Sequence, residues 1–182
     1  MNGYKKIKWK CNCYALKFST DSSQLCCCYK GIKGQFFTKW NLENKKITSE
    51  FEIDGAQVTV MAHEGIVAIA EGKTTVSIAE LSVSANGTRN ATLALKSGRL
   101  ASSLDPAKKA INNYSVRTPK GVAAARGTTF SVSLGNGGTL TVTVVEGQVP
   151  TFSLNGALLS TATAGTVVNS DGSSSTTQTL QQ

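Results

Sequence analysis

One histidine and five cysteines are the side chains of this sequence best suited to catalytic or metal chemistry. His63 is the only histidine, so a mechanism in which histidine activates a serine or a cysteine would have to use it. Its neighbours, Ala-His-Glu-Gly, supply no second metal ligand at helical spacing, which excludes a zincin-type site. We therefore expect His63 to lie at a turn or strand end, and we predict that the chain is not an enzyme.

The cysteines lie together near the start of the chain, at positions 11, 13, 26, 27 and 28. Thiolates bind zinc well, but these cysteines do not have C-x-x-C spacing, and adjacent cysteines rarely all reach one tetrahedral centre. The glycine-rich run 135–138 joins two expected strands and opens no helix, so it does not fit a dinucleotide loop. We predict no metal site and no cofactor.

The positive charge of the chain also belongs to its first fifty residues. They carry ten lysines and three acidic residues, a net charge of +7, whereas the remaining residues add +1 to reach the total of +8. Lysines alternate there with Tyr4, Trp9 and Tyr14, a mixture able to neutralise phosphates and stack on bases. The body of the chain lacks a matching basic patch, so a solvated charge run is favoured and no nucleic acid is expected as a partner.

From residue 51 onward the hydrophobic pattern has a period of two with glycines between the runs, which predicts β-strands. Val76 and Ile78 share one face, while Leu81 falls on the opposite parity, so we expect a bulge near residues 79–80. Leu93 and Leu95 are assigned to one strand and Leu100 to another. Only the segment 103–113 is helix-like. There Asp105 can cap a single turn whose first position is Pro106.

The clearest strands lie between residues 114 and 149. Residues 118–121 fit a type I turn, with proline second and glycine fourth. A three-residue loop at 135–137 would pair Val132 with Leu140 and Phe130 with Val142, with Gly137 in the left-handed conformation. A four-residue loop would instead set Ser133 against Leu140, so we predict the shorter one.

A glycine stands just before an expected strand at 64–67, 97–100 and 146–149, at unequal spacing. This pattern suits stacked short strands in an all-β fold, a β-roll or an irregular β-solenoid. We divide the chain into a Lys/Cys-rich extension at 1–50, which is either poorly ordered or non-native, an all-β domain at 51–170, and a polar tail at 171–182. The tail has the composition of a disordered segment or a linker.

An ordered set of residues in this domain resembles the FecR family of extracytoplasmic regulators, which is named for the control of ferric citrate transport. The resemblance covers about residues 60–168 and is strongest from residue 114 onward. The matching positions are Thr118, Pro119, Gly121, Arg126, Gly127, Thr128 and Phe130, followed by Glu146, Gly147 and Val149.

The resemblance implies an all-β domain, periplasmic or extracellular, that senses or relays a signal through contacts with a protein partner. In full-length members this domain is coupled across the inner membrane to a sigma factor. The partner it implies is therefore a receptor or a sigma-factor regulatory system.

In this sequence no apolar run reaches the roughly 20 residues of a spanning helix, and no signal peptide is visible at the start. The alternative is a secreted or surface adhesin or a carbohydrate-binding module, which would need exposed aromatic rings; Tyr114 and Phe152 are the main candidates.

Arg126 stands between three alanines and a glycine, just before an expected strand. Small neighbours allow two layers to approach closely. Our hypothesis is therefore that the Arg126 guanidinium is buried and bonds to turn carbonyls or to a carboxylate such as that of Glu146. The alternative is a solvated arginine at a strand end.

Overall fold

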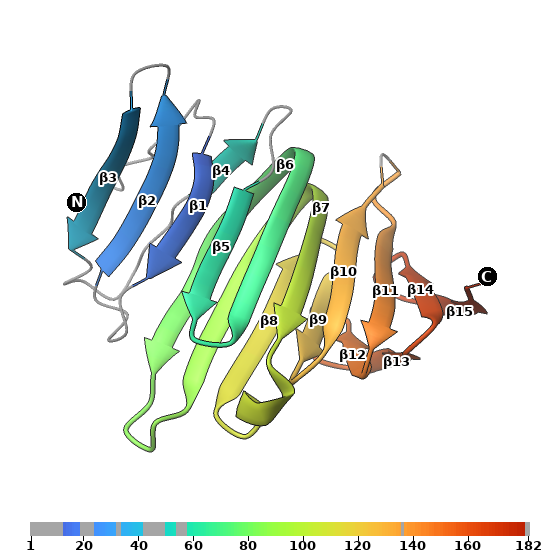
Figure 1. Ribbon diagram of the computed structural model, residues 1–182. Helices are drawn as coiled ribbons and strands as arrows, with labels where there is room; N and C mark the ends of the chain where they lie inside the picture. Colours follow the sequence, from blue (N-terminus) through green and yellow to red (C-terminus); the bar gives the residue numbers. More distant parts are fainter. Residues whose placement is uncertain are drawn as a thin grey trace, which may run out of the picture.

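The protein is an all-β chain folded into two facing sheet layers, as seen in a computed structural model (Figure 1). The structure describes residues 13–18, 24–31, 34–41, 50–53, 58–135 and 137–180, and describes side chains from residue 59 onward. The predicted fold class, stacked strands with no α-helix in the described ranges, is confirmed.

The strands follow one another with short connections. The first seven are β1 (Cys13–Phe18), β2 (Gln24–Gly31), β3 (Gly34–Asn41), β4 (Glu50–Ile53), β5 (Val58–His63), β6 (Ile66–Val83) and β7 (Arg89–Leu104). A 3-10 turn, η1 (Pro106–Lys108), precedes β8 (Asn112–Thr118), β9 (Gly121–Ala125), β10 (Thr129–Leu134), β11 (Leu140–Glu146), β12 (Gln148–Phe152), β13 (Leu158–Thr163), β14 (Thr166–Ser170) and β15 (Ser175–Thr179).

Strands β6 and β7 are long because each takes part in both layers. In the first layer, the second half of β6 pairs with β4 and with the first half of β7, and the sheet continues through β8, β9, β12 and β13. In the second layer, the first half of β6 pairs with β5, the second half of β7 pairs with β10, and β11, β14 and β15 follow. Strand β13 lies beside β14, so the folded sheet nearly closes into a barrel.

The two long strands change layer at a bulge. Gly98 of β7, with φ of +88°, lies opposite residues 72–74 of β6. The buried Thr74 ties the bulge together, because its hydroxyl donates to the Glu71 carbonyl at 2.5 Å and accepts from the Arg99 amide at 3.1 Å. The predicted separate strands for Leu95 and Leu100 are therefore wrong. They lie on one bent strand, and the parity of its buried residues switches at the bend.

The bulge predicted near residues 79–80 is confirmed. The pairing of β6 with β7 shifts between Ile78 and Glu80, at the point where the buried parity of the sequence changes. The predicted cap is also present, since the Asp105 carboxylate accepts a hydrogen bond of 2.9 Å from the Ala107 amide at the start of η1.

A single hydrophobic core lies between the two layers. Phe130 and Tyr114 meet edge to face there, with ring centroids 6.1 Å apart, and the Tyr114 hydroxyl shares a hydrogen bond of 2.9 Å with Ser102. The side chains of Leu93, Leu100 and Val132 are at most 1% exposed. Full burial of a side chain of this size contributes about 1.5–3 kcal/mol, so the alternating residues of both layers stabilise the fold.

The hairpin of β10 and β11 has a different register from the prediction. Val132 pairs with Val142, and Leu134 pairs with Leu140, two residues away from the predicted pairs. The predicted loop at 135–137 is therefore wrong as well, because the Gly135 amide donates to the Thr139 carbonyl at 3.0 Å and so continues the pairing of the two strands. Gly138, with φ of +74°, takes the left-handed position predicted for Gly137.

The two ends of the chain extend the second layer. Strand β1 pairs in parallel with β5, and β2 and β3 continue outward from it. The side chains of the lysine- and cysteine-rich segment lie outside the described residues, so its assignment as a separate extension stays a prediction. The expectation of a disordered tail is wrong for residues 171–179, because Asp171 accepts hydrogen bonds that close a turn and β15 then pairs with β14.

The bend at Gly98 provides a test of this architecture. A Cβ atom there would lie 2.6 Å from the Lys73 carbonyl oxygen, whereas a Cβ at Gly87, which also has a positive φ, meets nothing within 4 Å. We expect Gly98→Ala and Gly87→Ala both to lose about 1–2 kcal/mol for the left-handed backbone. Only Gly98→Ala should lose about 1–3 kcal/mol more, from the overlap. Chemical denaturation measures both, and equal losses would contradict the bend.

Candidate functional site

Most of the motif residues at 118–130 and 146–149 build the scaffold. The Thr118 hydroxyl donates to the Gly121 carbonyl at 3.0 Å and accepts from the Lys120 amide at 3.1 Å, which holds the turn between β8 and β9 around Pro119. A Cβ on Gly121 would collide with the carbonyl oxygen of Phe152. This glycine is therefore required where β12 joins β9.

The two other motif glycines mark where the chain crosses between layers. Gly127, with φ of +62°, packs so closely on η1 that a Cβ would lie 2.9 Å from Cα of Pro106. A Cβ on Gly147 would lie 2.6 Å from the Thr128 methyl group. The two crossings, β9 to β10 and β11 to β12, thus touch each other at Thr128 and Gly147.

The remaining motif residues divide into buried and exposed ones. Phe130 and Val149 are core residues, at 2% and 0% exposure. Arg126 and Glu146 are exposed, and in the described part of the chain no hydrogen bond or ion pair involves the Arg126 guanidinium. The hypothesis of a buried guanidinium is therefore wrong. Ala123 and Ala125 are buried, whereas the side chain of Arg126 is exposed to solvent.

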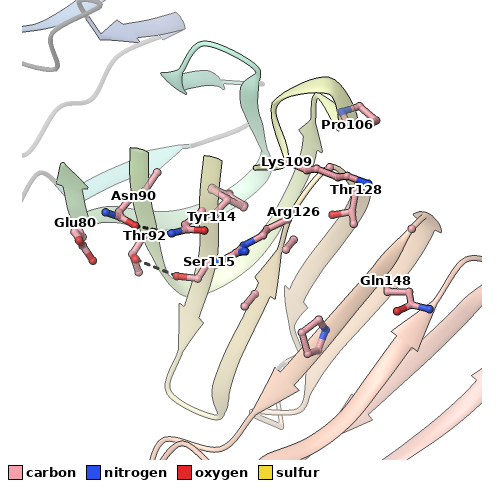
Figure 2. Close-up of a pocket in the computed structure, with 17 residues that line it drawn as sticks. Glu80, Asn90, Thr92, Pro106, Lys109, Tyr114, Ser115, Arg126, Thr128 and Gln148 are labelled. Carbon is pink, nitrogen blue, oxygen red and sulfur yellow. Dashed lines mark hydrogen bonds between the residues drawn. The ribbon is translucent and has the colours of Figure 1, made fainter. Parts of the chain in front are cut away.

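Arg126 instead borders a groove of about 660 Å³ on the outer face of the first layer (Figure 2). We call it the β9–β12 groove. It is lined by Glu80, Asn90, Ala91, Thr92, Pro106, Lys109, Asn113, Tyr114, Ser115, Ala124, Ala125, Arg126, Gly127, Thr128, Gly147, Gln148 and Pro150.

The floor of the groove consists of small and polar side chains in register across β7, β8 and β9. Thr92, Ser115 and Ala124 form one row, in which the two hydroxyls share a hydrogen bond of 3.0 Å. In the next row the Asn113 amide donates to the Asn90 side-chain oxygen at 2.9 Å. These hydrogen bonds fix the floor side chains against the sheet, so the floor is shallow and rigid.

His63 lies at a strand end, as predicted, in a polar cluster away from the groove. Its ring nitrogen Nε2 lies 3.3 Å from the Asn90 carbonyl, and burial lowers the pKa of His63 below its usual value. Next to it, Lys108 pairs with the Glu64 carboxylate and, with Arg89, lowers the pKa of Glu64. This cluster holds η1 against the β5–β6 turn, which is a structural role.

The described residues offer no group of three or more histidine, cysteine or acidic side chains that could hold a metal ion. The cysteines have no described side chains, so the prediction about them lies outside the described residues.

The floor residues Asn90, Thr92, Asn113 and Ser115 were not among the sequence candidates. Their only sequence signal is that they occupy the polar phase of alternating strands. Polar residues at alternate positions indicate that one face of a strand is exposed to solvent, but they do not indicate that this face contains a groove.

The exposure of Arg126 predicts a weak effect on folding. We expect Arg126→Ala to change the free energy of unfolding by less than about 0.5 kcal/mol, as at most surface positions. Phe130→Ala, four residues away, should cost about 3–5 kcal/mol because it empties the core. Urea denaturation of both variants measures this difference. A loss near 2 kcal/mol for Arg126→Ala would restore the buried-guanidinium hypothesis.

Comparison with solved structures supports the same fold. The chain is similar to two crystal structures from Parabacteroides distasonis ATCC 8503, each of a protein provisionally described as an anti-sigma factor. One gives a TM-score of 0.59 at 12% identity over 73% of this chain and 60% of that chain. The other gives 0.57 at 14% identity over 72% and 59%. The chain thus spans about 60% of the length of these solved relatives. A search of curated protein sequences finds no match.

The sequence profile of one family, described as FecR protein, matches residues 53–150, more than half of the chain. This range contains the complete motif, both layer crossings and the residues that line the groove. The chain therefore belongs to the FecR family.

Proposed function

We propose that this protein is a non-enzymatic regulatory domain of the bacterial cell envelope, which senses or relays a signal by binding a protein partner. The observation that carries the proposal is the β9–β12 groove. It lies next to the edges of β9 and β12, where the two strands are no longer paired with each other. Such unpaired strand edges can accept a strand of a partner protein. Membership of the FecR family and a fold shared with proteins described as anti-sigma factors support a regulatory role.

A carbohydrate-binding role finds less support. Such sites usually stack sugar rings on exposed aromatic faces, but the Tyr114 ring is only 3% exposed and packs on Phe130. Phe152 is half-buried beside the pairing with β9. The described part of the groove therefore presents no flat aromatic face to a sugar.

The place of action is part of the proposal. By family membership we place the domain in the periplasm or at the cell surface, with a receptor or a sigma-factor regulatory system as its partner. In the described residues no helix is long and apolar enough to cross a bilayer.

Deletion of the gene in the organism that encodes it tests the proposed function. We expect a coordinated change in the transcripts controlled by one sigma factor, restored when the wild-type gene is supplied in trans. RNA sequencing measures this change. An unchanged transcriptome, together with binding of the purified protein to a surface polysaccharide, would contradict the regulatory role and favour the adhesin alternative.

A further inference from the structure

The walls of the β9–β12 groove are two strand edges that part from each other. Strand β12 pairs with β9 only through Thr151 with Ala123 and Phe152 with Val122. The same register, continued, would set Pro150 against Ala124 and Gln148 against Arg126. These continued pairs are absent, and all four residues line the groove instead. Figure 2 shows Arg126 and Gln148 on separate strands that border it.

Each wall is already paired on its far side. Strand β9 pairs with β8 up to Ala125, and β12 pairs with β13 from Gln148 onward. On the side that faces the groove, residues 124–125 of β9 and 148–150 of β12 are not paired with another strand. Pro150 has no backbone N–H, and proline is typical of places where strand pairing stops. The opening is therefore a gap within a sheet, with a strand edge on each side.

The dimensions of the gap suit an extended chain. Beyond the two pairs with β12, the chain from Ala124 of β9 to Arg126 spans roughly 10 Å at the rise of a β-strand. Thr92, Ser115 and Ala124, on the outer faces of β7, β8 and β9 beside the gap, are small, so outward-pointing side chains of an inserted strand have room there. A short extended peptide fits such a gap better than a helix, whose diameter with side chains is about 10–12 Å.

The charges at one end of the groove select an acidic occupant. Arg126 and Lys109 both border the groove there, and among the described residues neither side chain has an acidic partner. The acidic residue of the lining, Glu80, belongs to β6 at the far side of the floor, beyond β7 and β8. A carboxylate beside Arg126 would gain a charge-assisted hydrogen bond.

We propose that an extended segment of the partner protein, carrying an acidic side chain, inserts between β9 and β12 as an added strand and pairs its carboxylate with Arg126. This inference rests on the proposed function, since it names how the protein partner is bound. The main chain of the segment provides affinity, and Arg126 with Lys109 provides the preference for acidic sequences.

The test uses phage-displayed random peptides of about eight residues, enough to span the gap, selected on the immobilised full-length chain. We expect enrichment of peptides that combine β-branched residues with Asp or Glu and lack proline at their centre. A synthetic copy of an enriched peptide should bind Arg126→Glu about tenfold more weakly or worse, the loss of one charge-assisted hydrogen bond. Changing its acidic residue to lysine should restore binding to Arg126→Glu.

Two tryptophan variants separate the groove from the rest of the surface. Ser115→Trp fills the floor and should abolish binding of the peptide. Thr143→Trp, which adds the same bulk to a half-exposed position on β11 outside the groove, should leave it unchanged. Circular dichroism and the melting temperature confirm that each variant is folded.

The outcomes distinguish this inference from the proposed function. If no peptide is enriched, or if enriched peptides bind Ser115→Trp and Arg126→Glu as well as wild type, strand insertion is wrong. If, in addition, both variants restore the transcripts lost on gene deletion, the regulatory function stands and uses another surface. If neither the deletion nor the variants change transcription while peptides still bind in the groove, the proposed function is wrong but the peptide site remains.

Discussion

The fold depends on two strands that each belong to both layers. Strands β6 and β7 pair with each other along most of their length, and they turn together from one sheet into the other at Gly98 and Thr74. Strands β4 and β5 pair directly with β6, and β8 and β10 pair directly with β7. The other described strands connect to this central pair through those four. Because no Cβ fits at Gly98, the bend is fixed by the backbone itself, and the two layers enclose one core rather than two.

The same geometry explains why the groove exists. The chain leaves the first layer after β9 at Gly127 and returns to it before β12 at Gly147, and the two crossings pack against each other through Thr128. Strands β9 and β12 must separate to reach these crossings, so their pairing ends after two residue pairs. The motif residues Gly127, Thr128 and Gly147 thus shape an open gap in the sheet. Arg126 borders that gap, and the proposed strand insertion would give this exposed residue a role.

The sequence was informative where local chemistry decides the structure. The capping by Asp105, the turn around Pro119 and the bulge before Glu80 follow from residue type and parity, and the structure confirms them. The small residues around Arg126 also predicted a close approach, and Gly127 does pack closely, although its partner Pro106 comes from another segment of the chain.

Long-range geometry was harder to predict. Parity assigned the correct faces to β10 and β11, but it is unchanged by a shift of two residues, so the register of Leu140 was missed. The burial of Arg126 was inferred from its small neighbours, yet side chains of successive residues point to opposite sides, and this one points outward. The polar tail was expected to be disordered because its composition is that of a linker. Pairing with β14, which composition does not reveal, makes part of it an edge strand.

The most direct test of this account is the pattern of nuclear Overhauser effects between β9 and β12 in the free protein. We expect cross-strand contacts between backbone protons of Val122 and Ala123 and those of Phe152 and Thr151, and none between Ala124 and Pro150 or between Arg126 and Gln148. A continuous series of contacts up to Gln148 would show a closed sheet with no gap. It would contradict both the origin of the groove and its role in binding.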